Sequence, residues 1–380
     1  MIEVIHFGLS ENKGGIESYL KRITENIDRK KVHFSFIDMT GEDSIPCIQE
    51  ELECFGADFY KITPRRKSVL QNRRELEYLF KNHSFDILHF HVNTLSYITP
   101  VEIALKYNCK VIIHSRSGSA SSLRITRLLH EINKCRIRKW PVVRIAVSEL
   151  AGKWLFGESS KYYIFNNAID TRKFKFDLEM RVKTRNVLKC ENCFVIGHVG
   201  AFLPVKNHEF LLNILAEIIK YDLNVRLWLI GDGPLKPRIE NMAAELGILE
   251  KIHFLGVRDD VNNLYSGMDL FVFPSEFEGF PNAVLEAQCE GIPCLISDSI
   301  TREVDILDCV YRISIKHSKE EWVEKILYLS KEKLKDDRYR KAASGIIDKR
   351  GFSVEVEKRR LENLYTWLAK KTDEKNRVHI

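Results

Sequence analysis

The sequence predicts an α/β protein built from two doubly wound parallel sheets, each forming a domain of its own. Short apolar runs alternate with longer segments of helical period along 380 residues that are 44% hydrophobic and 29% charged. Most of these runs are continuously apolar, which is typical of strands buried on both faces of a parallel sheet. Because a domain usually takes about 100–200 residues, this length favours two domains.

Ten apolar runs are the predicted strands, in two series of five. The first series covers residues 3–7, 32–37, 86–90, 110–114 and 142–147, and the second covers 193–199, 225–230, 251–255, 269–273 and 292–296. Helical patterns lie between them. In the segment 15–27, one apolar stripe consists of Ile16, Tyr19, Leu20, Ile23 and Ile27. Strand–helix alternation of this kind predicts right-handed βαβ units.

The alternation pauses between about residues 166 and 190, where the chain is polar, charged and poor in strand signal. We therefore predict a first domain over residues 1–168 and a second over 169–352, which opens with a helix near 179–189. The tail, residues 352–371, reads as one long amphipathic helix. Its apolar face consists of Val356, Leu361, Leu364, Tyr365 and Leu368.

Composition excludes several classes of protein. No stretch approaches the roughly 20 uncharged apolar residues of a membrane helix, and the N-terminus lacks the features of a signal peptide. The nine cysteines show neither zinc-site nor disulfide-framework spacing, so we predict a reducing cytoplasm. The net charge of +6 is too small to indicate a nucleic-acid partner.

Glycines mark two of the predicted turns that follow strands. Gly14 and Gly15 precede a helix, where backbone amides can approach an anion at the positive helix end. An ordinary turn between a strand and a helix explains the same pattern equally well. The run Gly231-Asp232-Gly233-Pro234 lacks the third glycine of the dinucleotide fingerprint, which counts against a nicotinamide or flavin enzyme.

The most informative polar residues also follow predicted strands, where parallel sheets bind ligands. Lys206 could reach a bound diphosphate, although a solvated loop lysine explains that residue alone. Glu278 and Glu286 flank a Gly-Phe-Pro turn that opens a helix. A ligand with a diphosphate and neighbouring hydroxyls suits this pattern, with phosphate on helix amides and hydroxyls on carboxylates. Taken alone, each residue also has an ordinary explanation without a ligand: Glu278 as a charge at a helix end, and Glu286 as a surface residue.

The ordered motifs resemble glycosyltransferase family 4, and most closely its capsular and exopolysaccharide branch. The similar segments span essentially the whole chain: DILHFH, VIIHSR, IAVSELAGKWLFG, NNAID, KNHEFLL, LIGDGPL, LGVRDDV and FPSEFEGFPNAVLEA. The resemblance implies a GT-B fold, with two Rossmann-like domains facing across a cleft. It also implies that the C-terminal helix 353–372 completes the first domain.

The function implied by the resemblance is that of a retaining glycosyltransferase. Such an enzyme moves a sugar from a nucleotide-sugar, usually a UDP-sugar in this family, to a growing lipid-linked surface polysaccharide or oligosaccharide. By the same resemblance, Gly15 contacts the donor phosphate from the first domain and Lys206 holds the diphosphate from the second. Three further residues would offer backbone amides to phosphate: Asn282, Ala283 and Val284.

The resemblance also implies which residues bind the sugar, the ribose and the base of the donor. Glu278, with the amides of Gly279 and Phe280, would grip the transferred sugar, and Glu286 would bind the ribose hydroxyls. Residues near the base would be Val257 and Arg258. The catalytic set implied in this way consists of Glu278, Lys206 and His114, of which His114 would lie near the acceptor.

The chain departs from the family pattern at two places that matter for chemistry. Ala201 stands where the family usually places an arginine beside the phosphates, and either Arg258 or Arg116 could substitute for that cation. The alternative is a degenerate GT-B protein that binds a sugar nucleotide or a partner enzyme without efficient turnover. The usual His-Ser-His-Asn is replaced by His114-Ser115-Arg116-Ser117. A sugar-nucleotide epimerase is less favoured, because it would have no use for the basic segment described below.

No metal or other cofactor is expected beside the nucleotide-sugar. The chain has no Asp-x-Asp, the metal–diphosphate clamp of the other main glycosyltransferase fold. Cations, backbone amides and helix ends would therefore neutralise the leaving group. Four histidines lie at or near strand ends without metal-site spacing: His6, His89, His91 and His114.

A basic segment over residues 123–144 predicts contact with a membrane surface. It carries Arg124, Arg127, Lys134, Arg136, Arg138, Lys139 and Arg144 against one acid, Glu131. Its apolar residues are Leu123, Leu128, Leu129, Ile132 and Trp140. Such a segment suits anionic headgroups of the inner membrane leaflet, where a lipid-linked glycan acceptor would lie, although a solvated basic face on a core helix is equally compatible. A cytoplasmic protein, peripheral on the membrane, is the resulting prediction.

Overall fold

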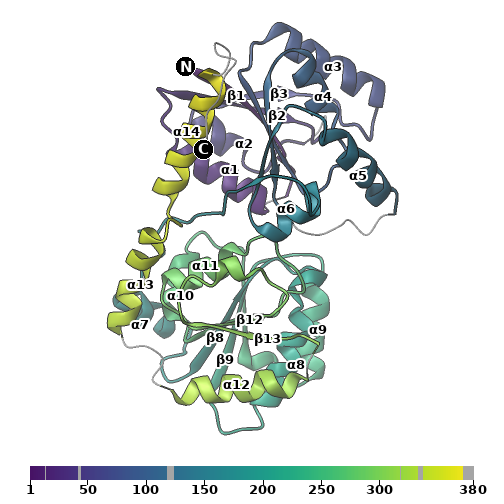
Figure 1. Cartoon of the computed structure of the whole chain (residues 1–380). Coiled ribbons are helices and arrows are strands. Elements are labelled where there is room, and N and C mark those ends of the chain that lie inside the picture. The colour runs from purple at the N-terminus through teal and green to yellow at the C-terminus, as the bar shows by residue number, and fades with distance from the viewer. Residues whose placement is uncertain (13, 42–43, 118–123, 317, 333–336, 371–380) are drawn as a thin grey trace. The chain divides into compact units, whose positions relative to one another are not determined.

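The computed structural model describes the chain except for residues 13, 42–43, 118–123, 317, 333–336 and 371–380. The chain forms two compact units (Figure 1). The first unit consists of Met1–Asn167 together with the chain from Val354, and the second is Ala168–Ser353. Each observed crossing between the units lies one residue from the predicted boundary.

The described part of the first unit contains one sheet of seven parallel strands in the order β3-β2-β1-β4-β5-β6-β7. The strands are β1 (Ile2–Phe7), β2 (Val32–Asp38), β3 (Asp58–Lys61), β4 (Ile87–Val92), β5 (Lys110–Ser115), β6 (Val143–Ala146) and β7 (Tyr163–Ile164). The helices are α1 (Gly15–Asn26), α2 (Gln49–Cys54), α3 (Val69–Asn82), α4 (Thr99–Lys106), α5 (Arg124–Ile137), α6 (Glu149–Phe156) and α14 (Val354–Lys370).

In the second unit the described residues form a six-stranded parallel sheet in the order β10-β9-β8-β11-β12-β13. Its strands are β8 (Phe194–Val199), β9 (Val225–Ile230), β10 (Ile252–Gly256), β11 (Leu270–Phe273), β12 (Cys294–Ser297) and β13 (Val310–Ile313). Its α-helices are α7 (Leu178–Val187), α8 (His208–Ile218), α9 (Lys236–Glu245), α10 (Val261–Gly267), α11 (Asn282–Cys289), α12 (Lys319–Lys331) and α13 (Asp337–Lys349). Three short 3₁₀ helices are η1 (Pro204–Lys206), η2 (Leu249–Lys251) and η3 (Arg302–Val304).

All ten predicted strands are present, and three further strands were missed. The missed strands β3, β7 and β13 each lie at the edge of a sheet. Their residues are partly or fully exposed, and they are short, as edge strands often are. They therefore lack the continuous apolar run that marks a strand buried on both faces.

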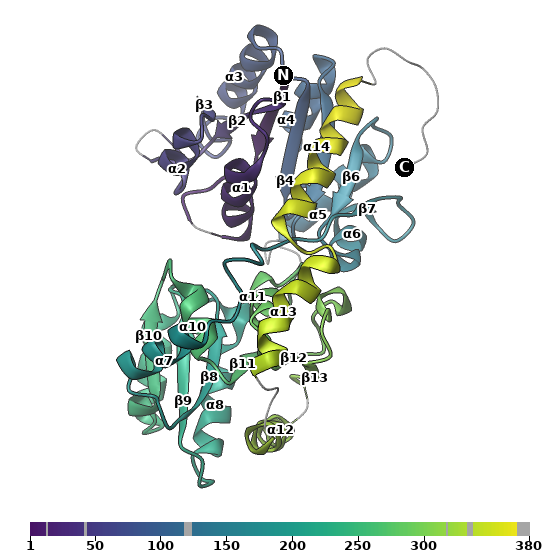
Figure 2. The ribbon, with the colours of Figure 1, turned by 90° about the vertical axis from the view of Figure 1, so that its left-hand side faces the viewer.

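The C-terminal helix α14 completes the core of the first unit. Leu361, Tyr365 and Leu368 are buried with the apolar side chains of α1, β1 and β2 in one cluster. Figure 2 shows α14 running beside α1 and over the strands, in agreement with its contacts to α1, β1 and β4. Arg22 on α1 also forms an ion pair of 3.0 Å with Glu357 on α14. The first unit thus contains both ends of the described chain.

Each sheet reverses its strand order at one place, and this place positions the functional site. Sequence order runs outward in opposite directions from the β1–β4 pair in the first unit and from the β8–β11 pair in the second. The loops after the two central strands diverge there to opposite faces, which leaves a crevice at the carboxyl edge of the sheet. Gly15 follows β1, Lys206 follows β8 and Glu278 follows β11.

None of the described helices is both long and apolar enough to cross a bilayer. All nine cysteines are free, as the absence of a disulfide framework in the sequence predicts. The second unit has its own core, in which Trp228 and Trp322 are fully buried. Helix α8 contacts both α9 and α12, and a second group of contacts joins α7 to α10, α10 to α11 and α11 to α13.

Stability should fall in mild acid because several histidines are buried. Burial lowers the pKa of His6 from 6.5 to about 3. Between these two values the unfolded chain binds a proton that the folded chain does not, so folding stability is complete above about pH 6.5 and is lost as pH falls. At pH 5.5 this one group should cost about 1.4 kcal/mol.

Urea unfolding at pH 7.5 and 5.5 measures this loss. A His6→Gln variant should reduce the difference in free energy of unfolding between the two pH values, whereas His83→Gln, at an exposed position, should leave it unchanged. An equal difference in the wild type and in His6→Gln would show that His6 is not a source of the acid sensitivity.

Candidate functional site

The loop after β8 is held in place by the glycines of the GDGPL motif. Gly231 has a φ of 138°, and a Cβ atom there would lie 2.2 Å from the Gly200 carbonyl oxygen. Only glycine permits this close approach of two backbones. The Phe202 amide then donates to the Asp232 carbonyl at 3.0 Å. The motif therefore fixes the loop that leads to Lys206.

Lys206 and Glu278 form an ion pair across the place where the strand order reverses. The Nζ–Oε1 distance is 2.5 Å, and the side chains are 18% and 17% exposed. The Lys206 ammonium also lies 4.7 Å from the centre of the Phe273 ring. A second bond ties the two loops together, because the Glu276 amide donates to the Val205 carbonyl at 2.9 Å. The sequence places these two residues at one edge but does not predict that they neutralise each other.

After Lys206 the chain turns sharply into α8. Asn207 adopts a left-handed conformation with φ 56° and ψ 45°, which asparagine tolerates better than most residues. The N-cap residues of α8 and α11, Asn207 and Pro281, make no side-chain capping hydrogen bond. Both helix ends thus direct amide groups and partial positive charge toward the carboxyl edge of the sheet, close to the Lys206–Glu278 pair.

Glu286 on α11 is partly buried and is held by a tyrosine that sequence reasoning missed. The Tyr265 hydroxyl lies 3.0 Å from Glu286 Oε2. Burial, followed by the charge of Glu286, holds the pKa of Tyr265 well above its ordinary value. Tyr265 therefore stays protonated and donates to the carboxylate. No pattern in the sequence marks Tyr265, since it is one apolar position of a short helix.

The residues between Glu278 and Glu286 form the turn before α11 and its first helical turn. Gly279 and Phe280 are buried between Glu278 and the helix, and the Phe280 ring stacks on Phe352 at 6.0 Å. Asn282, Ala283 and Val284 form the first turn of α11. The structure therefore brings the sugar-gripping and phosphate-binding residues of the resemblance onto one loop and helix end.

The two residues expected near the base follow β10. Val257 is exposed, and Arg258 forms a two-pronged ion pair with Asp260, with Nε–Oδ1 and Nη2–Oδ2 distances of 2.8 Å. The charge of Arg258 is therefore already compensated. This makes Arg258 a poor replacement for the arginine that the family places at Ala201.

Gly15 is the first residue of α1 and is exposed. A Cβ atom at Gly15 would meet nothing within 4 Å. No described atom of the first unit therefore fills the space beside this helix end. Glu17 braces the preceding loop, because Ser10 donates to Glu17 Oε1 through its amide at 3.0 Å and its hydroxyl at 2.7 Å. The contact of Gly15 with a phosphate stays a prediction.

His114 is completely buried in the first unit, next to three other histidines. Its Nδ1 lies 3.1 Å from His89 Nε2, and its Nε2 lies 3.2 Å from the Arg116 guanidinium. Both ring nitrogens are thus in contact with protein groups. The assignment of His114 to the acceptor remains a prediction, and the contacts indicate another task that we develop below.

Among the described residues, one histidine group has ring nitrogens close enough to share a metal ion. In His6, His89 and His91 these atoms lie within 4.8 Å of one another. The rings, however, stack with interplanar angles of 12° to 32°. His6 Nδ1 and His91 Nε2 are hydrogen-bonded to each other at 3.1 Å, and the two nitrogens of His89 contact Tyr365 and His114. Because these nitrogens are already engaged with protein groups, the arrangement does not suit tetrahedral zinc. The prediction that no metal is needed stays a prediction.

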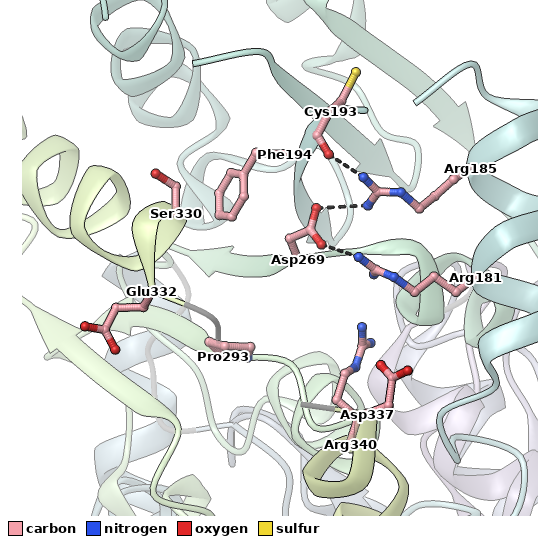
Figure 3. A pocket seen from close by; sticks show the side chains of 10 residues that line it. All are labelled: Arg181, Arg185, Cys193, Phe194, Asp269, Pro293, Ser330, Glu332, Asp337 and Arg340. Atoms are coloured by element: carbon pink, nitrogen blue, oxygen red, sulfur yellow. Dashed lines mark hydrogen bonds and ion pairs between the residues drawn. The ribbon is translucent and has the colours of Figure 1, made fainter. Parts of the chain in front are cut away.

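A charged pocket of about 350 Å³ lies elsewhere in the second unit. Figure 3 shows Arg181 and Arg185 converging on Asp269. Asp269 and Pro293 directly precede β11 and β12, so this pocket lies at the amino edge of the sheet, opposite to Lys206. The Arg340 guanidinium donates to backbone carbonyls, including that of Glu290 at 3.0 Å. Because these arginines hold main-chain groups, we interpret the pocket as structural.

The basic segment forms a helix only in its first part. Helix α5 spans Arg124–Ile137 and residues 143–146 belong to β6, while Leu123 lies outside the described residues. Polar His130 and Asn133 face inward, where both bond the Leu95 backbone. Apolar side chains face outward instead, with exposures of 68%, 61% and 50% for Ile125, Leu128 and Ile132. Leu128 and Ile132 therefore do not join the core.

Comparison with known proteins gives consistent matches. Residues 193–332 match the family described as "Glycosyl transferases group 1". The chain is 30% identical over 342 residues to the "Putative glycosyltransferase EpsF" of Bacillus subtilis (strain 168), covering 85% of this chain and 86% of that protein. It is 25% identical over 276 residues to the "UDP-Gal:alpha-D-GlcNAc-diphosphoundecaprenol alpha-1,3-galactosyltransferase" of Escherichia coli, covering 69% and 71% of the two chains.

Among solved structures, the fold matches that of Anabaena HepE, crystallised in complex with UDP and glucose. The TM-score is 0.79, the identity is 18%, and the match covers 97% of this chain and 100% of that chain. At this identity the likeness demonstrates the fold alone.

Replacing Glu278 and replacing Lys206 should change the affinity for an anion in opposite directions. Glu278→Gln removes the carboxylate that neutralises Lys206, so affinity for inorganic diphosphate should rise by about 3- to 10-fold. Lys206→Gln should lower it by about 10-fold or more, since a charge-assisted contact contributes about 1.5–3 kcal/mol. Isothermal titration calorimetry measures both, and a fall in affinity with Glu278→Gln would contradict this view of the pair.

Proposed function

The chain belongs to the group 1 glycosyl transferases, and we propose that it is a retaining enzyme that uses a UDP-sugar. The proposed acceptor is a lipid-linked saccharide of a growing surface polysaccharide. The observation that carries the proposal is the Lys206–Glu278 pair beside the uncapped amino end of α11. The names of relatives support it: one uses UDP-Gal and a diphosphoundecaprenol-linked sugar, and a structural neighbour was crystallised with UDP and glucose.

The donor would separate the ion pair when it binds. Lys206 would turn its charge to the diphosphate, which also meets the positive ends of α8 and α11. Glu278 would then accept hydrogen bonds from sugar hydroxyls, because a carboxylate freed from its cation needs new donors. Glu286, which accepts a hydrogen bond from Tyr265, would accept from the ribose hydroxyls in the same way.

Transfer with retention can proceed on one face of the sugar. The bond from C1 to the diphosphate oxygen breaks and its electrons leave with UDP, while the acceptor hydroxyl forms a new bond to C1 on the same face. The acceptor proton passes to the departing phosphate oxygen. Catalysis then depends on stabilising the leaving diphosphate and positioning the acceptor, which is the task that Lys206 and the helix ends suit.

A second candidate is a protein that binds the donor without efficient turnover. The observation in its favour is Ala201, an uncharged residue where the family usually has an arginine, together with the compensation of Arg258 by Asp260. Under this alternative the chain would bind UDP but would release no UDP from a UDP-sugar.

We further propose that α5 docks on the anionic inner leaflet of the membrane. The exposed apolar stripe of Ile125, Leu128 and Ile132 recurs at helical spacing and is flanked by basic residues, the pattern of a helix that lies in the interface. Its inner face is fixed by polar bonds to the Leu95 backbone. Docking would place the enzyme where lipid-linked acceptors lie.

Sugar transfer is tested with a panel of UDP-sugars and a synthetic diphospholipid-linked sugar. We expect UDP release that requires the acceptor, with an α-donor giving an α-linked product by NMR. Lys206→Ala and Glu278→Ala should each lower kcat/KM by about 100-fold or more, as for groups that act on the transition state. UDP binding without release would favour the non-catalytic alternative, and unchanged turnover in both variants would refute the site.

Membrane docking is tested by sedimentation with vesicles of phosphatidylcholine alone or with phosphatidylglycerol. Replacing both Leu128 and Ile132 by Glu should reduce binding to the anionic vesicles by about 10-fold or more, because each buried apolar side chain contributes about 1.5–3 kcal/mol. Leu70→Glu, at an equally exposed apolar position on α3, serves as the control. Equal binding by the double variant and the wild type would contradict docking through α5.

A further inference from the structure

Arg116 is an arginine of the first unit that makes no direct ion pair among the described residues, although the negative charges of Glu357 and Glu17 act to raise the pKa of its guanidinium. It follows β5 directly, and its amide donates to the Val92 carbonyl at 3.0 Å. Its guanidinium carbon lies 4.0 Å from the centre of the Tyr19 ring. Within the part of the chain that the structure describes, Arg116 makes no ion pair, in contrast to Arg22 with Glu357 and Arg258 with Asp260.

The charge of Arg116 persists at neutral pH although the side chain is only partly exposed. Burial lowers the pKa of its guanidinium to about 10. Holding a cation in such a place is costly unless an anion or hydrogen-bond acceptors surround it. In the described structure the side chain has one hydrogen-bond partner, His114, which takes an N–H of Nη1. The described residues make no hydrogen bond to the edge formed by Nε and Nη2, and this edge of a guanidinium can bind phosphate through two parallel hydrogen bonds.

The contact between Arg116 and His114 has only one possible direction. A guanidinium donates and cannot accept, so His114 Nε2 is the acceptor. Burial and then the charge of Arg116 hold the pKa of His114 well below its ordinary value, so the ring is neutral and its proton is on Nδ1. That proton is donated to His89 Nε2 at 3.1 Å.

The same reasoning extends to the C-terminal helix. Burial and neighbouring positive charge also hold the pKa of His89 well below its ordinary value. With its Nε2 accepting, the proton of neutral His89 is on Nδ1 and is donated to the Tyr365 hydroxyl oxygen at 2.7 Å. A directed chain therefore runs from Arg116 through His114 and His89 to Tyr365 on α14. His114 has no free lone pair for base catalysis in this arrangement.

We infer that Arg116 binds a phosphate or diphosphate group of a substrate, and that His114 is a positioning residue which orients this guanidinium. The site deepens the proposed function and rests on it for the source of the anion. The same chemistry is found in the diphosphate of a nucleotide-sugar donor and in that of a polyprenyl diphosphate acceptor. Tyr19, which supports the guanidinium, lies one helical turn after Gly15.

Calorimetry with UDP and with a short-chain polyprenyl diphosphate tests the inference. Arg116→Gln should weaken binding of at least one of these probes by about 10- to 100-fold. Loss for UDP identifies the donor as the source, and loss for the polyprenyl diphosphate identifies the acceptor. Arg29→Gln is the matched control, because Arg29 also lies over an aromatic ring, Phe55, but at the amino edge of the sheet before β2. Wild-type affinity of Arg116→Gln for both probes would overturn the inference.

Arg116→Lys provides a second test in case the Arg116→Gln variant does not fold. Lysine keeps the charge and loses the planar fork, so binding should weaken by several-fold while the melting temperature stays near that of the wild type. Unchanged affinity in a folded Arg116→Lys protein would also count against the site. If the wild type transfers sugar and Arg116→Gln is fully active, this inference fails and the proposed function stands. If the wild type uses no UDP-sugar but Arg116→Gln loses diphosphate binding, the proposed function fails and this inference stands.

The positioning role of His114 has its own spectroscopic signature. Long-range ¹H–¹⁵N correlation spectra at pH 7.5 should show neutral His114 and His89 with the proton on Nδ1. Arg116→Ala should abolish the constraint on His114 and alter its spectrum, whereas Arg29→Gln should not. A proton on His114 Nε2 in the wild type would break the chain at its first contact and overturn the positioning role.

Discussion

The constraint on which the structure depends is the parallel direction of both sheets. Because every strand of a unit ends at the same edge, loops from distant parts of the sequence meet there. Lys206 and Glu278 are separated by 72 positions, yet their charged atoms lie 2.5 Å apart because β8 and β11 are neighbours. The reversal of strand order between these two strands gives their loops room to bind a ligand.

Charge compensation differs among the cations of this chain. Arg181, Arg185 and Arg258 are paired with aspartates, and they hold loops and helices in place. Lys206 is paired with Glu278, which belongs to the same site in the proposed function, so the charge of Lys206 would become available when a ligand binds. Arg116 makes no direct ion pair among the described residues and contacts an aromatic ring and a neutral histidine. In the inference above, its guanidinium binds an external anion.

The buried histidines illustrate how burial converts a reactive group into a structural one. His89 and His114 are neutral at physiological pH because burial disfavours the charged ring. Their hydrogen bonds then have fixed directions, and they connect a strand-end arginine to Tyr365 on α14. The same neutrality makes the first unit sensitive to acid, since protonation is possible only when the chain unfolds.

The sequence by itself determined the strands buried on both faces, the two units and the identity of most residues at the carboxyl edge. Those features are local: a continuous apolar run, a glycine at a turn, or a proline before a helix. Tertiary structure alone decided the edge strands β3, β7 and β13, whose polarity resembles that of loops, and the outward direction of the apolar side chains on α5. It also decided which charges neutralise each other. The pairing of Lys206 with Glu278, the support of Glu286 by Tyr265 and the contact of Arg116 with Tyr19 depend on distances between strands and helices far apart in the chain. No local pattern encodes them.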